Sequence, residues 1–464
     1  MAKDLRSYLE WFVKKYPEEF VEVGEVIDPA HHEVAAYLKL MEDRGRFPVT
    51  IFRQVKNLKG EPSQFPLVHN ILATRSFLAM TVGLEPSNYR MGLVTRLGEM
   101  QESPIDYEVI APNQAPVMEN VWRGEEADIT RLPAACYHEK DAGPYFVMAC
   151  ALKGKSGNFY NVTMTKNMIF GPRRMSISAH AHHHLAEIIT EHEHVDEPTP
   201  VAVILGHHPA FYLASCTATP YGNDDYRTIG GFLNEPLRLV PSASLGDDFL
   251  IPADAEIVIE GLVLPGVRES QNPFGEISGH YQPPGMYPVI EAQAICFRNN
   301  ALMEGTLPSH PEHHNLGGIP KEGSIFKAIK REVPGVKAVF LPNSGCSRFS
   351  SYISLEKKTF RDVQVAAMIA FSEMENLKVA IVVDEEIDVF NETEVLWAVI
   401  TQTRWDKDLT VIPRVQSARD WFGDAVVIID ATHPEDVSDF PERNRMPEEV
   451  ISRIRSRFQS FNSS

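Results

Sequence analysis

The chain has 464 residues, of which 63 are acidic and 44 are basic, so its formal net charge is -19. Its hydrophobic content of 44% is enough for a folded core and excludes a largely disordered chain. Because this excess of negative charge repels phosphate backbones, we expect no nucleic-acid partner.

The length allows about three domains at roughly 150 residues each. The first, residues 1–116, is expected to be an α/β region. Apolar residues recur with helical spacing over residues 5–16 and 33–43, and a β-rich run covers residues 49–55. A cluster of prolines then indicates a boundary: Pro104, Pro112 and Pro116.

The second part, residues 117–302, consists of apolar runs separated by Gly, Pro and Asn. This pattern predicts a mostly β domain, a barrel or a sandwich, with one helical insertion over about residues 175–191. The clearest runs cover residues 145–152, 201–205, 255–264 and 289–297.

The third part, residues 303–464, alternates helix and strand, which predicts a parallel α/β unit. Residues 358–374 have the spacing of an amphipathic helix, and residues 378–383 that of a buried strand. Asn391 and Glu394 form a candidate capping box at the start of a helix over residues 392–403. The expected fold class is therefore α/β (α+β).

The five cysteines are scattered and include no Cys-x-x-Cys pair, so we expect reduced thiols. The first residues are charged throughout, unlike a signal peptide, and no apolar run reaches the length of a membrane span. We expect a cytoplasmic protein with no membrane partner.

The standard nucleotide and hydrolase motifs are absent, and two of the remaining polar clusters have open interpretations. The histidines at positions 180, 182, 183 and 184 either bind a metal or belong to a solvated helix. Asp224 and Asp225 follow a turn, where carboxylates usually face water.

The strongest local signal is the segment Asn-Pro-Phe-Gly-Glu-Ile-Ser-Gly-His-Tyr at residues 272–281. Glu276 lies between two glycines and beside Phe274. Because glycine allows a close approach of the backbone to a ligand, an ordinary turn explains this segment poorly.

This segment resembles the signature of the UbiD-type decarboxylases, a Gly-Pro-Phe-Gly-Glu/Asp sequence that leads into Thr/Ser-Gly-Tyr/His. Residues 161–182 are similar to the family's Asn-x4-Arg segment, which is followed by a His about twenty residues later. Residues 378–388, Trp397-Ala398, Thr403-Arg404 and residues 430–432 are similar to its C-terminal segments. The resemblance covers about residues 140 to 435.

The resemblance implies a prenylated FMN, supplied by a flavin prenyltransferase and held in a split β-barrel. The C-terminal α/β domain would form a homodimer, or take part in a higher homo-oligomer. Lys378 would bind the cofactor phosphate. The implied cofactor-binding positions are Asn161, Val162, Thr163, Met164, Thr165, Lys166, Ala181, His182, Ser215, Asp225 and Lys378.

The resemblance also implies two metal ions. Mn²⁺, or Mg²⁺, would be bound by Asn161, His182 and Asp225, where Asp225 is one methylene shorter than the family's Glu. A monovalent ion, K⁺, would be bound largely by backbone carbonyls. Its positions are Val162, Ala214, Ser215, Thr217 and Asp225.

The catalytic group of the family is an Arg-Glu-Glu/Asp network, and this chain departs from it twice. Lys166 replaces the Arg and lacks its bidentate fork. Gln271 replaces the first Glu and cannot carry a proton, so Glu269, on the same face of an extended strand, is the candidate substitute. Glu276 keeps the position of the proton donor.

The implied function is the non-oxidative, reversible decarboxylation of an aromatic or heteroaromatic carboxylic acid, with release of CO₂, through a covalent adduct with the cofactor. Phe274, His310 and His313 are expected in the substrate pocket, although a solvated loop explains the histidines equally well. Three alternatives stay open. They are a decarboxylase of α,β-unsaturated acids, an FMN oxidoreductase, and a non-catalytic protein that binds metal through the His cluster.

Overall fold

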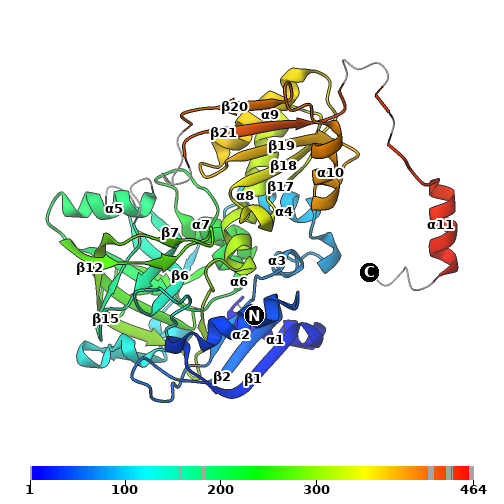
Figure 1. The fold of residues 1–464 in the computed structure, drawn as a ribbon. Coiled ribbons are helices and arrows are strands. Elements are labelled where there is room, and N and C mark those ends of the chain that lie inside the picture. The colour runs from blue at the N-terminus through cyan, green and yellow to red at the C-terminus, as the bar shows by residue number, and fades with distance from the viewer. Residues whose placement is uncertain are drawn as a thin grey trace.

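The computed structural model describes residues 3–155, 158–179, 183–415, 423–434, 440–441 and 443–458. It has the mixed helix and sheet content expected from the sequence (Figure 1). His182 and Ala181, which are predicted cofactor ligands, lie outside the described residues, as does His180.

The N-terminal region forms a small sheet covered by helices. The sheet has the order β1-β2-β3-β16, and its last strand comes from the chain segment that follows the central region. The two helices and the strand expected over residues 5–16, 33–43 and 49–55 are confirmed. The elements are α1 (Leu5–Lys15), β1 (Phe20–Ile27), α2 (Glu33–Glu42), β2 (Val49–Val55), β3 (Leu67–His69), α3 (Arg75–Thr81), α4 (Met91–Gln101) and β16 (Met303–Glu304).

The central region is built on a seven-stranded sheet with the order β5-β15-β12-β9-β6-β7, in which β8 also pairs with β15. A single bridge between Ile169 and Met175 links the end of β7 to β8, so the sheet curls back toward β15. Its elements are β4 (Glu108–Val109), β5 (Asn120–Arg123), β6 (Tyr145–Lys153), β7 (Tyr160–Met168), β8 (Arg174–Ser176), α5 (His184–Glu193), β9 (Thr199–Ile204), α6 (Pro209–Ser215), α7 (Asp225–Leu233), β10 (Arg238–Pro241), β11 (Leu250–Pro252), β12 (Ile257–Gln271), β13 (Phe274–Gly275), β14 (Tyr281–Gln282) and β15 (Gly285–Phe297).

The prediction of a single helical insertion in the central region was wrong about the residue at which the helix begins and about the number of helices. Residues 174–176 pair with β15, so α5 begins only at His184. Two further helices follow. Pro209 stands in the first turn of α6, after the N-cap His208. Asp224 caps α7 by accepting the N–H of Tyr226 at 3.0 Å, so this turn carboxylate starts a helix.

The C-terminal region is a layered α/β unit. Strands β18, β19 and β21 are parallel, as expected, and the sheet order is β17-β18-β19-β21-β20. Asn391 caps its helix, but Glu394 does not complete a capping box. The elements are α8 (Pro311–Glu332), β17 (Val336–Phe340), β18 (Ser350–Leu355), α9 (Phe360–Glu373), β19 (Val379–Asp384), α10 (Glu392–Gln402), β20 (Leu409–Ile412), β21 (Val426–Ala431) and α11 (Glu448–Arg457).

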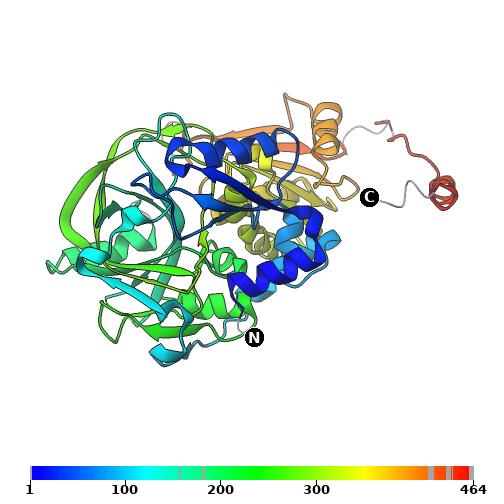
Figure 2. The same ribbon diagram turned by 90° about the horizontal axis from the view of Figure 1, so that it is seen from below.

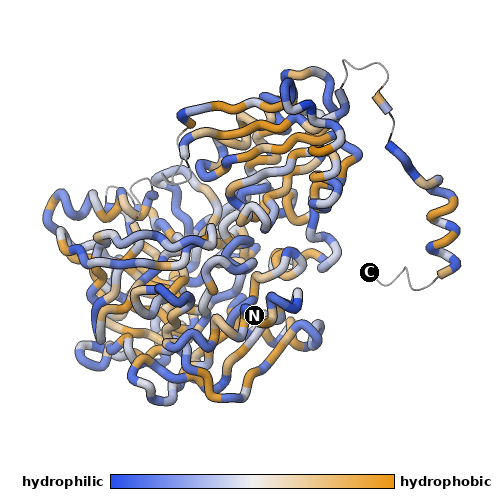
Figure 3. The backbone as a smooth tube through the Cα atoms, viewed as in Figure 1, coloured by the Kyte–Doolittle hydropathy of each residue, from blue (hydrophilic) through white to orange (hydrophobic). Residues whose placement is uncertain are grey.

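Hydrophobic side chains form one large core and two smaller ones. The large core runs from Leu5 to Ile319 and is shared by the N-terminal and central regions. The two smaller cores lie on either face of the C-terminal sheet, whose strands are the orange segments in the upper part of Figure 3. The division of the chain at residues 116 and 302 stays a prediction, and the large core, which runs from Leu5 to Ile319, crosses both boundaries.

Helix α8 connects the large core to the C-terminal sheet. Its residues Leu316 and Ile319 belong to the large core, and Ile325 and Ile329 pack under the C-terminal sheet. Figure 2, the view from below, shows the blue N-terminal elements on the side nearest the viewer, in front of parts of the other two regions. All five cysteines are free thiols. Among the described helices, none combines the length and apolar character needed to cross a membrane.

Candidate functional site

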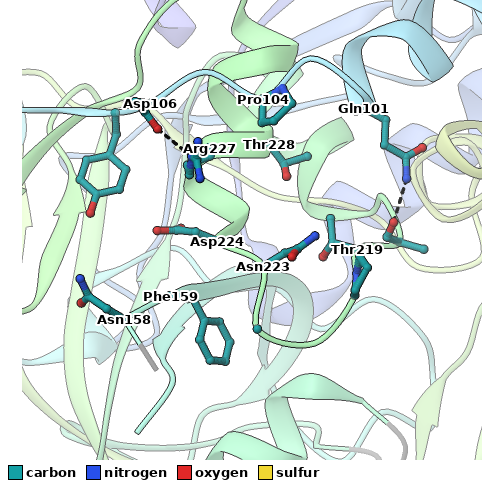
Figure 4. A pocket seen from close by; sticks show the side chains of 14 residues that line it. Gln101, Pro104, Asp106, Asn158, Phe159, Thr219, Asn223, Asp224, Arg227 and Thr228 are labelled. Carbon is teal, nitrogen blue, oxygen red and sulfur yellow. Dashed lines mark hydrogen bonds and ion pairs between the residues drawn. The ribbon is translucent and has the colours of Figure 1, made fainter. Parts of the chain in front are cut away.

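Figure 4 shows a cavity of about 870 Å³ between the end of α4, the start of β7 and the first turn of α7. Its polar groups mostly bind one another: Arg227 pairs with Asp106 at 2.7 Å, and Gln101 donates to the carbonyl of Ala218 at 2.8 Å. Asp224 is used as a helix cap. Of the predicted site residues that the structure describes, none lines this cavity.

A second cavity, of about 560 Å³, contains most of the predicted site residues. One wall is β7, which pairs with β6 and is the last strand in the sheet order. Val162 donates its N–H to Asp225, and Lys166 accepts from the N–H of Ser178, so alternate backbone groups of β7 face away from β6. The predicted residues in the lining are Asn161, Val162, Thr163, Met164, Thr165, Lys166, Ser215, Thr217, Asp225, Glu276 and His313.

Asp225 and Asn161 meet at one end of β7. The Asp225 carboxylate accepts hydrogen bonds from the Asn161 amide at 2.9 Å, the Val162 N–H at 2.8 Å and the Thr219 hydroxyl at 2.8 Å. Burial raises the pKa of Asp225 to about 6 because it disfavours the charged form, although the hydrogen bonds from these three neutral donors act in the opposite direction. The buried Oδ1 of Asn161 has no hydrogen-bond partner in the described part of the chain.

These oxygen atoms fit a divalent cation, which would bind the unused Asn161 oxygen and stabilise the buried carboxylate. Asp225 is the first residue of α7 and reaches β7 directly, despite its shorter side chain. Within the described ranges, no group of three His, Cys, Asp or Glu side chains is arranged for a metal. His182, the third predicted ligand, lies outside these ranges.

The predicted K⁺ positions gather at the C-terminal end of α6. Ala214 and Ser215 are its last two residues, and the N–H of Thr217 binds the Ala214 carbonyl at 3.0 Å. Val162, Ser215, Thr217 and Asp225 line the cavity, whereas Ala214 does not. Helix C-termini carry partial negative charge, which favours a cation there.

Glu276 lies in a tight turn after β13 and is only 2% exposed. Its N–H binds the carbonyl of His280 at 2.8 Å, and Gly279, with a φ of 74°, closes the turn. A Cβ at Gly275 would lie 2.2 Å from the His138 ring, so this glycine allows contact with His138 rather than with a ligand. The turn holds the Glu276 side chain against the cavity.

Lys166 forms an ion pair with Glu276 and donates a hydrogen bond to its Oε1. The Lys166 ammonium lies 5.1 Å from the centre of the Phe274 ring. The exposed fractions of the two side chains are 13% and 2%, so the pair is largely screened from water. Phe274 itself packs against Tyr145, with 4.3 Å between ring centres, and lies behind the lining of the cavity.

Gln271 and Glu269 lie outside the cavity lining. The buried Gln271 amide accepts from Ser176 and donates to Ser178 at 2.8 Å. Glu269 forms an ion pair with Arg174 at 2.6 Å, and its side chain is 30% exposed. The structure therefore does not bring Glu269 together with Glu276.

Two other expected residues also lie away from the cavity. Lys378 donates its ammonium to the carbonyl of Gly423. His310 caps α8 by accepting the N–H of Glu312 at 3.4 Å, and burial lowers its pKa to about 3, so its ring is neutral.

Sequence reasoning missed several basic or polar groups of the lining, among them Lys321, Arg348 and Ser178. Lys321 follows Pro320 inside α8, and Arg348 follows a short 3-10 helix. No motif singles out either cation. His183 and His184 of the predicted His cluster also line the cavity, and burial lowers the pKa of both.

Comparison with protein families gives two adjoining matches. Residues 108–311 match the 3-octaprenyl-4-hydroxybenzoate carboxy-lyase Rift-related domain of the UbiD family. Residues 314–425 match the C-terminal domain of the same carboxy-lyase.

Curated relatives include anhydromevalonate phosphate decarboxylase of Methanothermobacter thermautotrophicus, 29% identical over 77% of this chain and 81% of that protein. Gallate decarboxylase of Lactiplantibacillus plantarum is 27% identical over 95% of this chain and 96% of that protein.

Solved structures of decarboxylases are similar to this chain over nearly its whole length. The UbiD-class enzyme HmfF from Pelotomaculum thermopropionicum, in an evolved dimeric form with prFMN, is 30% identical with a TM-score of 0.86. That match covers 97% of this chain and 98% of HmfF. The 3,4-dihydroxybenzoic acid decarboxylase from Enterobacter cloacae is 25% identical, with a TM-score of 0.86 and coverage of 98% and 99%.

Proposed function

The chain belongs to the UbiD family of decarboxylases, and on that premise we propose that it releases CO₂ from an aromatic or heteroaromatic carboxylic acid without net oxidation. In this proposal Glu276 takes up a proton from water and passes it to the carbon that has lost CO₂, and it then returns to the carboxylate form that pairs with Lys166. The observation that carries the proposal is the buried ion pair between Glu276 and Lys166 at the cavity.

The choice of Glu276 rests on a comparison with the other carboxyl groups of the cavity. Asp225 is bound by three neutral donors beside the proposed metal position. Glu373 and Glu375 are exposed to water. Glu276 is the buried carboxyl group with a cation beside it, and a positioned acid of this kind accelerates proton transfer by about 10² to 10⁴.

Lys166 has two roles in this proposal. Its charge attracts the carboxylate of the substrate into the cavity, and its ammonium holds the Glu276 side chain in place through the hydrogen bond to Oε1. Gln271 cannot exchange protons, and Ser176 and Ser178 fix its amide, so we assign it a structural role.

We propose that the outward-facing backbone of β7 and the residues around Asn161 hold a prenylated FMN, supplied by a flavin prenyltransferase. When bound, this flavin supplies the electron acceptor that removal of CO₂ from an sp² carbon requires. Asn161 and Asp225, with His182, would bind Mn²⁺ or Mg²⁺, and the α6 carbonyls would bind K⁺. The unpartnered Asn161 oxygen and the raised pKa of Asp225 support the divalent site.

An α,β-unsaturated acid is the second candidate substrate. It is favoured by the similarity to enzymes named anhydromevalonate phosphate decarboxylase. We also propose a homodimer formed through the C-terminal region. Leu396 and Ile400, one turn apart on α10, are 53% and 70% exposed and support this interface. The cytoplasmic location stays a prediction.

The proposal is tested with protein produced together with a flavin prenyltransferase. We expect a bound flavin one prenyl group heavier than FMN by mass spectrometry, and CO₂ release from at least one acid in a panel of pyrrole, furan, indole, hydroxybenzoate and acrylic acids. Plain FMN with oxidation of a substrate would support an oxidoreductase instead. Metal binding without CO₂ release from any acid would support a non-catalytic protein.

A further inference from the structure

The turn that carries Glu276 is hydrogen-bonded to residues at the start of α8. The hydroxyl of Ser309, two residues before the helix begins, donates to the backbone carbonyl of Glu276. The Nε2 atom of His314, in the first turn of the helix, lies 3.0 Å from the carbonyl oxygen of Ile277. Because a carbonyl oxygen only accepts hydrogen bonds, the His314 ring donates this one. Two consecutive carbonyls of the turn are therefore bound from the start of α8.

These contacts fix the peptide group between Glu276 and Ile277. Its carbonyl accepts from the Ser309 hydroxyl and from the N–H of Gly279, at 2.9 Å. Its N–H, on Ile277, lies 3.4 Å from the Oε2 atom of the Glu276 carboxylate. In a planar trans peptide the N–H and the carbonyl point in opposite directions, so a donor that holds the carbonyl also sets the direction of the N–H. Lys166 binds the other carboxylate oxygen, Oε1.

Ser309 has a backbone conformation that serine rarely adopts. Its φ is 58°, in the left-handed region, which glycine enters without the steric cost that other residues carry. The hydroxyl is the group that serine offers here and glycine lacks, and it donates to Glu276. A strained residue whose side chain binds the turn of the proposed proton donor supports a functional role for that side chain.

We propose that Ser309 and His314 are positioning residues for proton transfer, which act on the Glu276 carboxyl group through the peptide that follows it. The inference rests on the proposed function, in which Glu276 passes a proton to the substrate carbon. When Glu276 takes up this proton it becomes neutral, so its hydrogen bond to Lys166 loses the strength that the negative charge provides. The contacts from α8 do not depend on this charge, because backbone carbonyls accept them. They hold the turn in place in both protonation states.

The test uses full-length protein that carries prenylated FMN. The probes are pyrrole, furan, indole and phenol, which are decarboxylated products of acids in the panel above. Exchange of their ring protons for deuterium in D₂O is followed by NMR at saturating and at limiting concentrations of the probe. Flavin content and melting temperature are measured for every variant.

Ser309→Ala should lower the exchange rate at saturating probe by about tenfold, because the carboxyl group then spends less time in the productive orientation. The half-saturating concentration should change by less than about twofold, since binding of the probe does not use this hydroxyl. Ser309→Gly accepts the φ of 58° without strain but lacks the hydroxyl, so it should be equally slow.

His314 is tested by a conservative rescue. His314→Leu should be slow, and His314→Gln, whose amide N–H can replace the ring donor, should recover at least about half of the parent rate. The control is Ser324→Ala, which removes a hydroxyl-to-carbonyl hydrogen bond of 3.0 Å further along α8 and outside the cavity lining. This control should keep the parent rate.

A double substitution separates positioning from a general effect on the fold. In the Glu276→Gln protein, Ser309→Ala should cause no further loss, because the group that Ser309 positions is gone. An equal loss in both backgrounds would overturn the inference, as would the parent rate in both Ser309→Ala and Ser309→Gly while Glu276→Gln is slow. The parent rate in Glu276→Gln, or no exchange by the parent protein, would instead overturn the proposed function on which the inference rests.

Discussion

Lys166 is the residue at which the candidate site departs most clearly from the family pattern. A lysine offers a single point charge where the family has a planar fork, so it cannot bind a carboxylate through two parallel hydrogen bonds. In this structure its ammonium binds Glu276 directly and lies over Phe274. The orientation of the side chain of Glu276, the proposed proton donor, therefore depends on its ion pair with Lys166, which is largely screened from water.

This arrangement predicts the effects of two substitutions of Lys166. Lys166→Met should lower kcat/KM by about 10² or more, because a mispositioned general acid loses most of its benefit. Lys166→Arg restores the charge and should recover much of the activity. The measurement is CO₂ release at saturating and limiting substrate. Equal activity of the Met variant and the parent protein would remove Lys166 from the mechanism.

Asp225 and its neighbour Asp224 form a matched pair for testing the metal site. Asp225→Asn should weaken Mn²⁺ binding by at least about tenfold, because the neutral amide loses the attraction to the cation. Asp224→Asn should not, since Asp224 caps α7 and lines the other cavity (Figure 4). Isothermal titration of metal-free protein with Mn²⁺ decides between them. Equal Kd values for both variants would place the metal elsewhere.

At the scale of elements, α8 joins the N-terminal loops to the cavity and the C-terminal sheet. Glu312 in its first turn is 3% exposed and accepts the N–H groups of Asn70 at 3.0 Å and Leu72 at 2.9 Å. Burial raises the pKa of Glu312 from 4.5 to about 7. The folded state therefore favours the protonated form of this carboxyl group.

This raised pKa predicts a pH dependence of stability. The contribution of Glu312 is fully present below about pH 4.5 and is lost as the pH rises through about 7, because the folded state binds the proton more tightly than the unfolded state. Over that range the free energy of unfolding should fall on the order of 3 kcal/mol relative to Glu312→Gln, which does not titrate. Urea unfolding of both proteins at pH 5 and pH 8 measures this. Parallel curves would contradict the assignment.

Periodicity in the sequence predicted elements whose faces differ clearly in polarity. The helices α1 and α2 and the strand β2 agree with it within one residue at each end. It failed at α6, where all seven residues are buried and no polar face exists to reveal a helical period. It also failed at residues 174–176, because pairing with β15 is a contact between residues distant in sequence.

The sequence predicted the residues of the candidate site that belong to a recognisable motif, and it did not predict the others. Glu276 is marked by the glycines around it, and Asn161, Lys166 and Asp225 by the family pattern. Lys321 and Arg348 carry no motif, since only the packing of Arg348 on Gly317 brings them together. The prediction that Glu269 takes over the role of the family's Glu at position 271 rested on the shared face of an extended strand. In the structure, Arg174 forms an ion pair with Glu269 outside the cavity.

At the scale of the whole molecule, the C-terminal region leaves apolar surface uncovered. Leu396 and Ile400 protrude from α10, and Val411 on strand β20 is 57% exposed. Helix α11 lies apart from the body of the molecule and buries none of its residues (Figure 1). Apolar surface of this kind is typical of an association interface.

The proposed dimer predicts that Ile400→Asp shifts the protein toward a monomer, because the charge would have to be buried at the interface. Val26→Asp is the control, since Val26 is 59% exposed in the N-terminal region. Light scattering after size-exclusion chromatography gives the mass of each variant. A monomeric parent protein, or a dimer that survives Ile400→Asp, would exclude this interface.

The central claim is that Glu276 delivers the proton to the carbon that loses CO₂. The most direct test is to incubate the decarboxylated product in D₂O with protein that carries prenylated FMN. The exchange of its ring protons for deuterium is followed by NMR. Glu276→Gln should lower the exchange rate by about 10² or more while the flavin stays bound, and Glu373→Gln, an exposed carboxyl of the same cavity, should leave it unchanged. Exchange at the parent rate in Glu276→Gln would contradict the account.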